Sequence, residues 1–184
     1  MLHFAGKTVR RLATEMRGAE IAEAAAVLPL MFMMLLGIFW FGQAFSIYGS
    51  ITRAAQEGAR AGAAPYCTTC TVGVNSRAQN AFNAAQAVLV TAKLDPNRAR
   101  YPTPQPVLNT CLNTGGTQAC DGSASTNVCV QTPVQLTSTV IGGAGVCGVS
   151  VTFQYPFQFW LPFTSLNKQQ ILLNAAARVR METR

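Results

Sequence analysis

Apolar residues of the N-terminal third form one long block. From Ala24 to Phe45 there is no ionisable side chain, and Gln43 is the one strongly polar residue. Roughly 20 such residues are enough for a helix to cross about 30 Å of hydrocarbon. The block is longer than the apolar part of a signal peptide, and no small-residue cleavage site follows it. We therefore expect one transmembrane helix that remains as an anchor.

The helical pattern continues beyond this block. Residues 46–64 keep a helix-forming composition, and Arg53, Glu57 and Arg60 have the spacing of neighbours on one helix surface. Pro65 then interrupts the pattern. We expect the span to extend into one long helix that ends near residue 64.

A second amphipathic helix is predicted over residues 75–94. Its apolar positions recur with the three- and four-residue spacing of a helix face. They are Ala78, Phe82, Ala85, Leu89 and Ala92. Asp95-Pro96 is expected to stop this helix.

Period-two alternation replaces the helical period in the last third of the chain. Residues 149–155 and 171–179 alternate apolar and polar or small side chains, and this predicts two half-buried strands. Residues 127–132 are a third expected strand, and Gly115–Thr126 and Gly142-Gly143 are expected connections. The predicted fold class is α+β, with a long N-terminal transmembrane helix, a second helix and an antiparallel sheet.

The chain has a net charge of +7, and its basic residues are informative mainly at the N-terminus, where they indicate the orientation of the predicted span. The first 18 residues hold four basic groups against the single acid Glu15, and basic flanks of a first span stay in the cytoplasm. They are Lys7, Arg10, Arg11 and Arg17. The rest of the chain is therefore expected to be exported. It contains no basic run, so nucleic-acid binding is excluded as a function class.

Six cysteines follow the span, and export gives them an oxidising compartment. They are Cys67, Cys70, Cys111, Cys120, Cys129 and Cys147. An even number of cysteines in an exported domain indicates disulfides, although six allow 15 connectivities. We expect each cysteine to pair with its neighbour in the sequence: Cys67 with Cys70, Cys111 with Cys120, and Cys129 with Cys147.

The Cys67-Thr-Thr-Cys70 spacing has two further interpretations. A zinc site would need a second close pair or histidines, and the only histidine, His3, is on the cytoplasmic side. A thioredoxin-like redox site would need the pair to open a helix in a βαβ unit, whereas here it follows Pro65. A structural disulfide is the favoured interpretation, with the other two left open.

The exported part lacks the residues of a catalytic centre. Its acids are Glu57, Asp95, Asp121 and Glu182, which are far apart in the sequence, and it has no histidine. The stretch from Asp121 to Asn127 places oxygens like a calcium loop but has one carboxylate where such loops use several. We therefore expect no enzyme activity, no catalytic residue, no metal and no cofactor.

The start of the apolar block carries a more specific signal. In "MRGAEIAEAAAVLPL", Gly18 lies at the boundary between basic and apolar residues, and Glu23 is the fifth residue after it. This arrangement resembles the processing site of type IV prepilins and pseudopilins. With "ITRAAQEGARAGA" and the final "ILLNAAARVRMETR", the chain is similar to the TadE family of pseudopilins from tight-adherence (Flp-type, type IVc) pilus systems.

The resemblance implies a processed, membrane-anchored assembly component. A prepilin peptidase would cut between Gly18 and Ala19, separating a basic leader of residues 1–18 from a helix over 19–64. Residues 65–184 would form a pilin-like, disulfide-stabilised head. The implied partners are the peptidase, other pilins or pseudopilins, the pilus assembly platform and the inner membrane. The implied location is a single-pass protein of the bacterial inner membrane with a periplasmic head, displayed on a pilus or the cell surface after assembly.

Glu23 would then have an assembly role. After cleavage, Ala19 carries a new α-ammonium, and Glu23 could pair with it in the same or a neighbouring subunit, where low dielectric makes an unpaired charge costly. A simpler interpretation is that Glu20 and Glu23 complement the helix macrodipole. The chain departs from the family in having Ala24 after Glu23, where an aromatic residue is usual, and in the second acid Glu20.

Two other functions remain open at this point. The span could tether a binding or adhesin head that does not enter a pilus. More remotely, Cys67 and Cys70 could form a periplasmic thiol oxidoreductase site. Cleavage after Gly18 separates the first of these from an assembly component, and reaction with a thiol probe separates the second.

Overall fold

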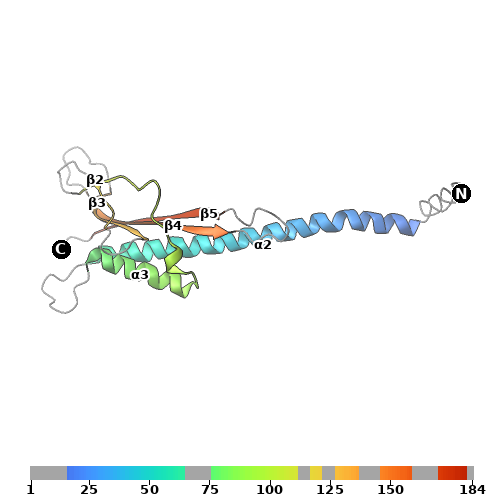
Figure 1. The fold of residues 1–184 in the computed structure, drawn as a ribbon, viewed down its shortest axis with the longest axis horizontal. Coiled ribbons are helices and arrows are strands. Elements are labelled where there is room, and N and C mark those ends of the chain that lie inside the picture. The colour runs from blue at the N-terminus through green and yellow to red at the C-terminus, as the bar shows by residue number, and fades with distance from the viewer. Residues whose placement is uncertain are drawn as a thin grey trace. The chain divides into compact units, whose positions relative to one another are not determined.

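The computed structural model describes residues 16–64, 76–111, 117–121, 127–136, 146–158 and 170–181, and for residues 16–20 the backbone only. These segments form a long helix, a second helix and antiparallel sheets, so the predicted α+β fold is confirmed (Figure 1). The chain divides into two compact units, Met1–Ala44 and Phe45–Arg184. The boundary lies within the long helix.

The long helix, α2, spans Met16–Ala63, and its C-terminal end agrees with the predicted end near residue 64. Pro29 lies inside it. Proline has no backbone N–H, so the carbonyl four residues earlier receives no hydrogen bond from this position. At the other end, the Ala64 N–H donates to the Arg60 carbonyl at 3.1 Å, which completes the last turn before Pro65.

The second helix, α3, spans Arg77–Thr91. The Ser76 side chain caps its N-terminus by accepting from the Gln79 N–H at 3.1 Å, which satisfies one of the free donors of the first turn. The chain leaves the helix through Lys93, whose φ of 58° is left-handed, and the Leu94 N–H donates back to the Leu89 carbonyl. The short 3-10 helix η1, Pro96–Arg98, follows.

Three strands form the main sheet, and all three were predicted. They are β3 (Cys129–Gln135), β4 (Cys147–Gln158) and β5 (Gln170–Arg180), antiparallel in the order β3-β4-β5. The β4–β5 ladder runs without a register shift from Gly148 opposite Arg180 to Gln158 opposite Gln170. Two short strands, β1 (Leu108–Asn109) and β2 (Thr117–Gln118), form a separate pair that the sequence did not predict.

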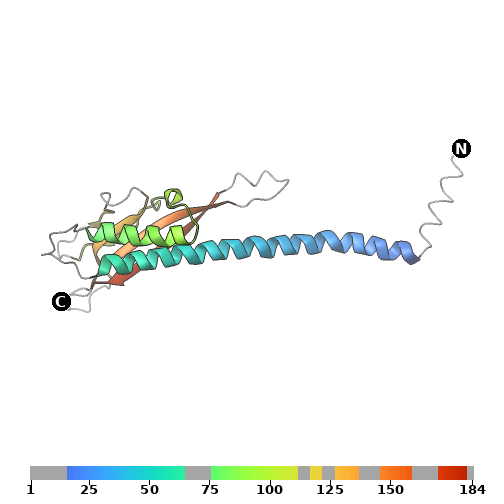
Figure 2. The ribbon, with the colours of Figure 1, turned by 90° about the horizontal axis from the view of Figure 1, so that it is seen from below.

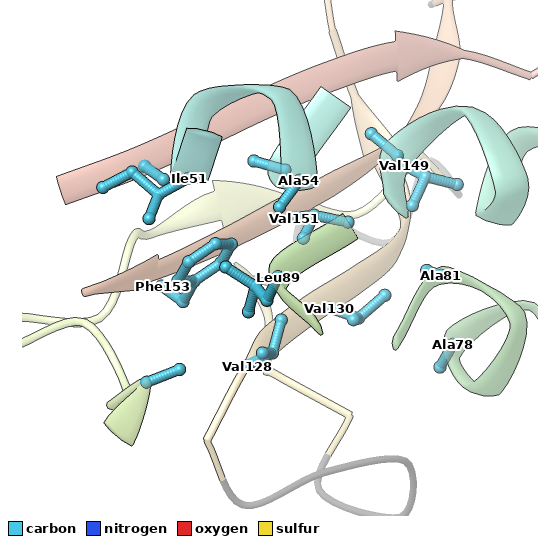
Figure 3. Close-up of a cluster of buried hydrophobic side chains, with 14 of the residues drawn as sticks. Ile51, Ala54, Ala78, Ala81, Leu89, Val128, Val130, Val149, Val151 and Phe153 are labelled. Atoms are coloured by element: carbon cyan, nitrogen blue, oxygen red, sulfur yellow. The ribbon is translucent and has the colours of Figure 1, made fainter. Parts of the chain in front are cut away.

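The core of the second unit lies between one face of this sheet and two helical segments. Figure 2 shows α3 alongside the C-terminal part of α2, with the strands behind them. Side chains from both helices and from β3 and β4 meet in this layer (Figure 3). Ile51, Leu89 and Phe153 are the largest fully buried side chains there, each exposed by 1% or less.

Small residues let the two helices approach each other closely. A Cβ at Gly58 would lie 2.8 Å from the Ala81 carbonyl oxygen, and one at Gly62 would lie 3.0 Å from the Ala81 Cβ. Ala54 and Ala59 add further small buried side chains on α2. The helix contact therefore depends on the absence of side-chain bulk, and large residues from the sheet fill the remaining space.

The prediction that β4 is half-buried is wrong, whereas the same prediction for β5 is confirmed. β4 is buried on both faces: Ser150 on its polar face is 1% exposed and Gln154 is 7% exposed. Gln131, opposite Ser150 on β3, donates through Nε2 to the carbonyls of Pro106 (2.9 Å) and Gln118 (2.6 Å). The segment between η1 and β3 thus covers the second face of the sheet, which periodicity alone does not reveal.

The predicted nearest-neighbour disulfides are also wrong for the four cysteines that the structure describes. The bonds join Cys111 to Cys147 and Cys120 to Cys129. On the β3–β4 ladder Cys129 lies opposite Thr152 and Cys147 opposite Gln135. Five residues of strand, about 17 Å, therefore separate Cys129 from Cys147, and a disulfide needs Cα atoms within about 7 Å.

Cys111 and Cys120 are kept apart for a similar reason. Leu108 lies opposite Gln118 on the β1–β2 pair, so the same register would place Cys120 opposite Pro106. Cys111 instead lies beside β3, where its N–H donates to the Pro133 carbonyl. The strand register therefore selects the observed bonds over the sequence neighbours.

Candidate functional site

The first part of α2 exposes an unusual amount of apolar surface. Large side chains between residues 21 and 45 are 53–76% exposed: Ile21, Val27, Leu28, Leu30, Met31, Phe32, Met33, Met34, Leu35, Ile38, Phe39, Phe41 and Phe45. The candidate span is Ile21–Ala63; its defining 18-residue window has a mean hydropathy of 2.2, and none of it is buried. Contiguous exposed apolar surface of this size marks a membrane or protein contact.

Glu23 is the ionisable residue of this apolar stretch. Its side chain is exposed, and it lies seven residues beyond Met16 along α2, a rise of about 10 Å. The helix macrodipole acts mainly within the first turn. In the unprocessed chain Glu23 therefore lies too far along α2 to be stabilised by the macrodipole. This weakens the interpretation that its carboxylate serves only to complement the helix macrodipole.

Gly18 and Ala19 also lie within α2, and the described part of the helix is continuous through them. Ala19 and Glu23 are four residues apart, which places them about 6 Å apart along the axis on nearly the same face. Glu20 follows Ala19 directly and lies about 100° around the helix from it. The helix therefore brings the predicted processing and assembly positions together and offsets Glu20 from them.

The remaining predicted site residues lie in the second unit. Cys111, Cys120, Cys129 and Cys147 are all oxidised, whereas Cys67 and Cys70 lie outside the described residues. Asp121 donates its N–H to the Val130 carbonyl at 2.8 Å, and residues 122–126 of the calcium-like stretch lie outside the described residues. Among the described residues, no group of three or more histidine, cysteine or acidic side chains could hold a metal ion.

A groove between α2 and α3 has polar groups from both helices, mainly from α2. Ser50, Arg53 and Glu57 form its α2 wall, and the other wall is formed by Ala84, Ala87, Val88 and Thr91 of α3 and by Ala92 just after it. Glu57 pairs with Arg60 at 3.1 Å, so the predicted charge spacing forms one exposed ion pair. Such a pair adds little stability. The groove has no buried polar group that would define a ligand site.

Sequence reasoning missed two features of the second unit that affect how it can interact. One is the close α2–α3 contact at Gly58 and Gly62, for which the four-residue spacing of the glycines was a usable signal. The other is the outer edge of β5, which no described strand covers. Recognising that edge required the strand order, which the sequence pattern does not contain.

Comparison with known proteins gives one match. The family model for TadE-like proteins matches residues 18–60, which begin at Gly18 and end near the C-terminus of α2. No curated protein and no solved structure matches the chain. Residues 18–60 are therefore similar to TadE-like proteins, in agreement with the resemblance that the sequence predicted.

Proposed function

We propose that the chain is a pseudopilin or minor pilin, processed by a prepilin peptidase, that takes part in assembling a Tad/Flp-type pilus. The observation that carries this proposal is the position of Gly18 and Glu23 on α2, directly before an exposed apolar helix surface. The TadE-like match supports it because that match begins at Gly18. The proposed role is non-enzymatic.

The proposed mechanism starts with the new N-terminus. Cleavage after Gly18 removes the basic leader and places the α-ammonium of Ala19 one turn before the Glu23 carboxylate. At the edge of hydrocarbon each charge is costly alone, and pairing within or between subunits offsets that cost. The apolar side chains of α2 then pack against equivalent helices of other pilins, while the head is displayed outside the membrane.

The test of this proposal is the mass of the intact chain extracted from membranes of cells with an active prepilin peptidase. We expect a chain that begins at Ala19. Gly18→Leu should leave the full-length form, because a bulky side chain does not fit a cleft that accepts glycine. Gly37→Leu is the matched control, since a Cβ at Gly37 meets no atom within 4 Å, and it should be processed normally.

A tethered binding or adhesin protein is the second candidate. The two disulfides that fasten loops onto the sheet favour this second candidate, because disulfides persist in the oxidising environment outside the cell. In that case the span is only an anchor, and every chain would keep its N-terminal leader. The same mass spectrum therefore separates the two candidates.

A further inference from the structure

The two edges of the β3-β4-β5 sheet differ in how they are covered. The β3 edge is occupied: Thr110 bridges to Val134, the Cys111 N–H donates to the Pro133 carbonyl, and the Asp121 N–H donates to the Val130 carbonyl. Both disulfides fasten this covering segment to the sheet. No described strand pairs with the outer edge of β5.

The register identifies which backbone groups face that open edge. Just beyond β5, the Met181 N–H donates to the Cys147 carbonyl at 2.9 Å. Because Gly148 lies opposite Arg180, Cys147 lies opposite Met181, and these two residues form a hydrogen-bonded pair. Hydrogen-bonded pairs alternate along an antiparallel ladder. The odd-numbered residues of β5 therefore bond to β4, and the even-numbered residues from 170 to 180 direct their N–H and C=O groups outward.

An independent pair of hydrogen bonds agrees with this alternation. On the opposite side of β4, the Gln154 N–H donates to the Arg100 carbonyl at 2.9 Å, and the Arg100 N–H donates to the Gln154 carbonyl at 2.8 Å. Even-numbered residues of β4 thus bond toward β3, which leaves its odd-numbered residues for β5. The outward direction of the even-numbered β5 groups follows from both observations.

The open edge is long and regular. β5 has 11 residues, no proline, and no bulge along its ladder with β4. Proteins usually protect such an edge by shortening, bending or covering it, because its free N–H and C=O groups can pair with another chain. Here the β3 edge is covered, whereas among the described residues β5 has only the charges of Arg178 and Arg180 at its C-terminal end.

The side chains along β5 divide its edge into two ends of different chemistry. At the N-terminal end Ile171 is 46% exposed and Leu172 is 40% exposed. At the C-terminal end Arg178 and Arg180 are exposed, and neither has an ion-pair partner within the described residues. A strand that fits this edge would be apolar beside Leu172 and acidic beside Arg178 and Arg180.

We propose that the outer edge of β5 docks an extended segment of another protein, which adds a fourth strand to the sheet. Main-chain hydrogen bonds from the even-numbered residues supply affinity, and the apolar and basic ends set the direction. A second copy of the head fits less well. Its β3 edge is covered, an antiparallel β5–β5 pair would set the basic end of each strand beside the apolar end of the other, and a parallel pair would set the arginines of the two copies side by side. This inference goes beyond the proposed function and does not depend on cleavage after Gly18.

The probe for the test is a synthetic peptide of the same length as β5 with the alternating side-chain pattern of a strand. One half of the peptide is apolar, and the other half carries glutamates. Its binding to the full chain in detergent is measured by fluorescence anisotropy. Ala176→Pro removes an outward N–H and leaves the β4 ladder intact, because proline is tolerated on an edge strand where its nitrogen faces outward. Ala176→Ser is the matched control that keeps the N–H.

We expect Ala176→Pro to weaken peptide binding about tenfold, the effect of losing one or two main-chain hydrogen bonds, and Ala176→Ser to bind like the wild type. Arg178→Glu with Arg180→Glu should reverse the preference toward a peptide carrying lysines. Near-ultraviolet circular dichroism checks that each variant remains folded. Absence of binding to the wild type, equal binding to folded Ala176→Pro, or a disulfide crosslink between two copies of an Ala176→Cys variant would each overturn the proposal.

Discussion

The two stretches of α2 show how one helix serves two environments. Between residues 21 and 44 its large apolar side chains are mostly exposed, as at Ile38, which is 67% exposed. Between residues 45 and 63 the buried positions are mainly small, and Ile51 is fully buried. Bulky residues face outward where lipid or another helix can surround them, and small residues are found where α3 must come close. The two stretches therefore differ in the size of their packed residues as well as in hydrophobicity.

The largest expected effect comes from the disulfide that fastens the segment before β2 to the sheet. Replacing both Cys111 and Cys147 by serine should destabilise the head by about 4 kcal/mol, because this bond closes a loop with a sequence separation of 36 residues. Membrane insertion should not change, since neither cysteine belongs to the apolar stretch of residues 21–44. Chemical unfolding in detergent, followed by near-ultraviolet circular dichroism, measures the first effect, and carbonate extraction of membranes measures the second.

Two isoleucines of α2 provide a direct comparison between the stretches. Ile51→Ala should cost about 3 kcal/mol of head stability, because it removes a fully buried side chain from a packed core. Ile38→Ala removes the same atoms from an exposed position and should leave the unfolding of the head unchanged. Equal effects of the two substitutions would show that burial does not distinguish the stretches.

Two glycines test the same comparison by adding bulk. Gly58→Leu forces a side chain against the Ala81 carbonyl oxygen, which a Cβ would meet at 2.8 Å. Overpacking of this kind costs about 3 kcal/mol, and the better helix propensity of leucine recovers about 1 kcal/mol, for a net loss near 2 kcal/mol. Gly42→Leu is the control, because a Cβ there meets no atom within 4 Å. Thermal unfolding should shift in the first variant and not in the second.

The smallest expected effect is a pH dependence that belongs to the head alone. Burial raises the pKa of Tyr101 above its usual 10.0, and the negative charge of Asp121 raises that pKa further. Because the folded-state pKa is the higher one, this contribution to stability is complete below pH 10 and is lost as the pH rises through the folded-state pKa. Tyr101→Phe should therefore flatten the alkaline decline in stability, as measured by urea unfolding between about pH 9 and 11.

Periodicity predicted the elements that repeat a pattern over many residues. α2 was recognised from its long apolar block, α3 from a helical face, and β4 and β5 from period-two alternation, with β3 as the third expected strand. β1 and β2 were missed, since two residues each are too few to show a period. Asp95 and Pro96 marked the region where α3 gives way to η1, although the helix itself ends a few residues earlier, at Thr91.

Features that depend on pairing between distant segments were not predictable. The partner of Cys129 follows from its position opposite Thr152, and no local sequence rule contains that register. Burial of Ser150 likewise depends on a covering segment that joins Gln131 through two carbonyls. The Gly18 and Glu23 positions were found because their spacing is local. Their roles in processing and assembly remain predictions.

The most direct test of the central claim is the amount of pilus that can be sheared from cells carrying Glu23→Ala. The substitution makes α2 more apolar, so insertion should be normal or better. Removing one member of a desolvated ion pair can cost several kcal/mol, so the sheared pilus yield should fall to background. Glu20→Ala, offset around the helix from Ala19, should give a milder defect. A wild-type yield from Glu23→Ala, with normal insertion, would contradict the account and favour a tethered head.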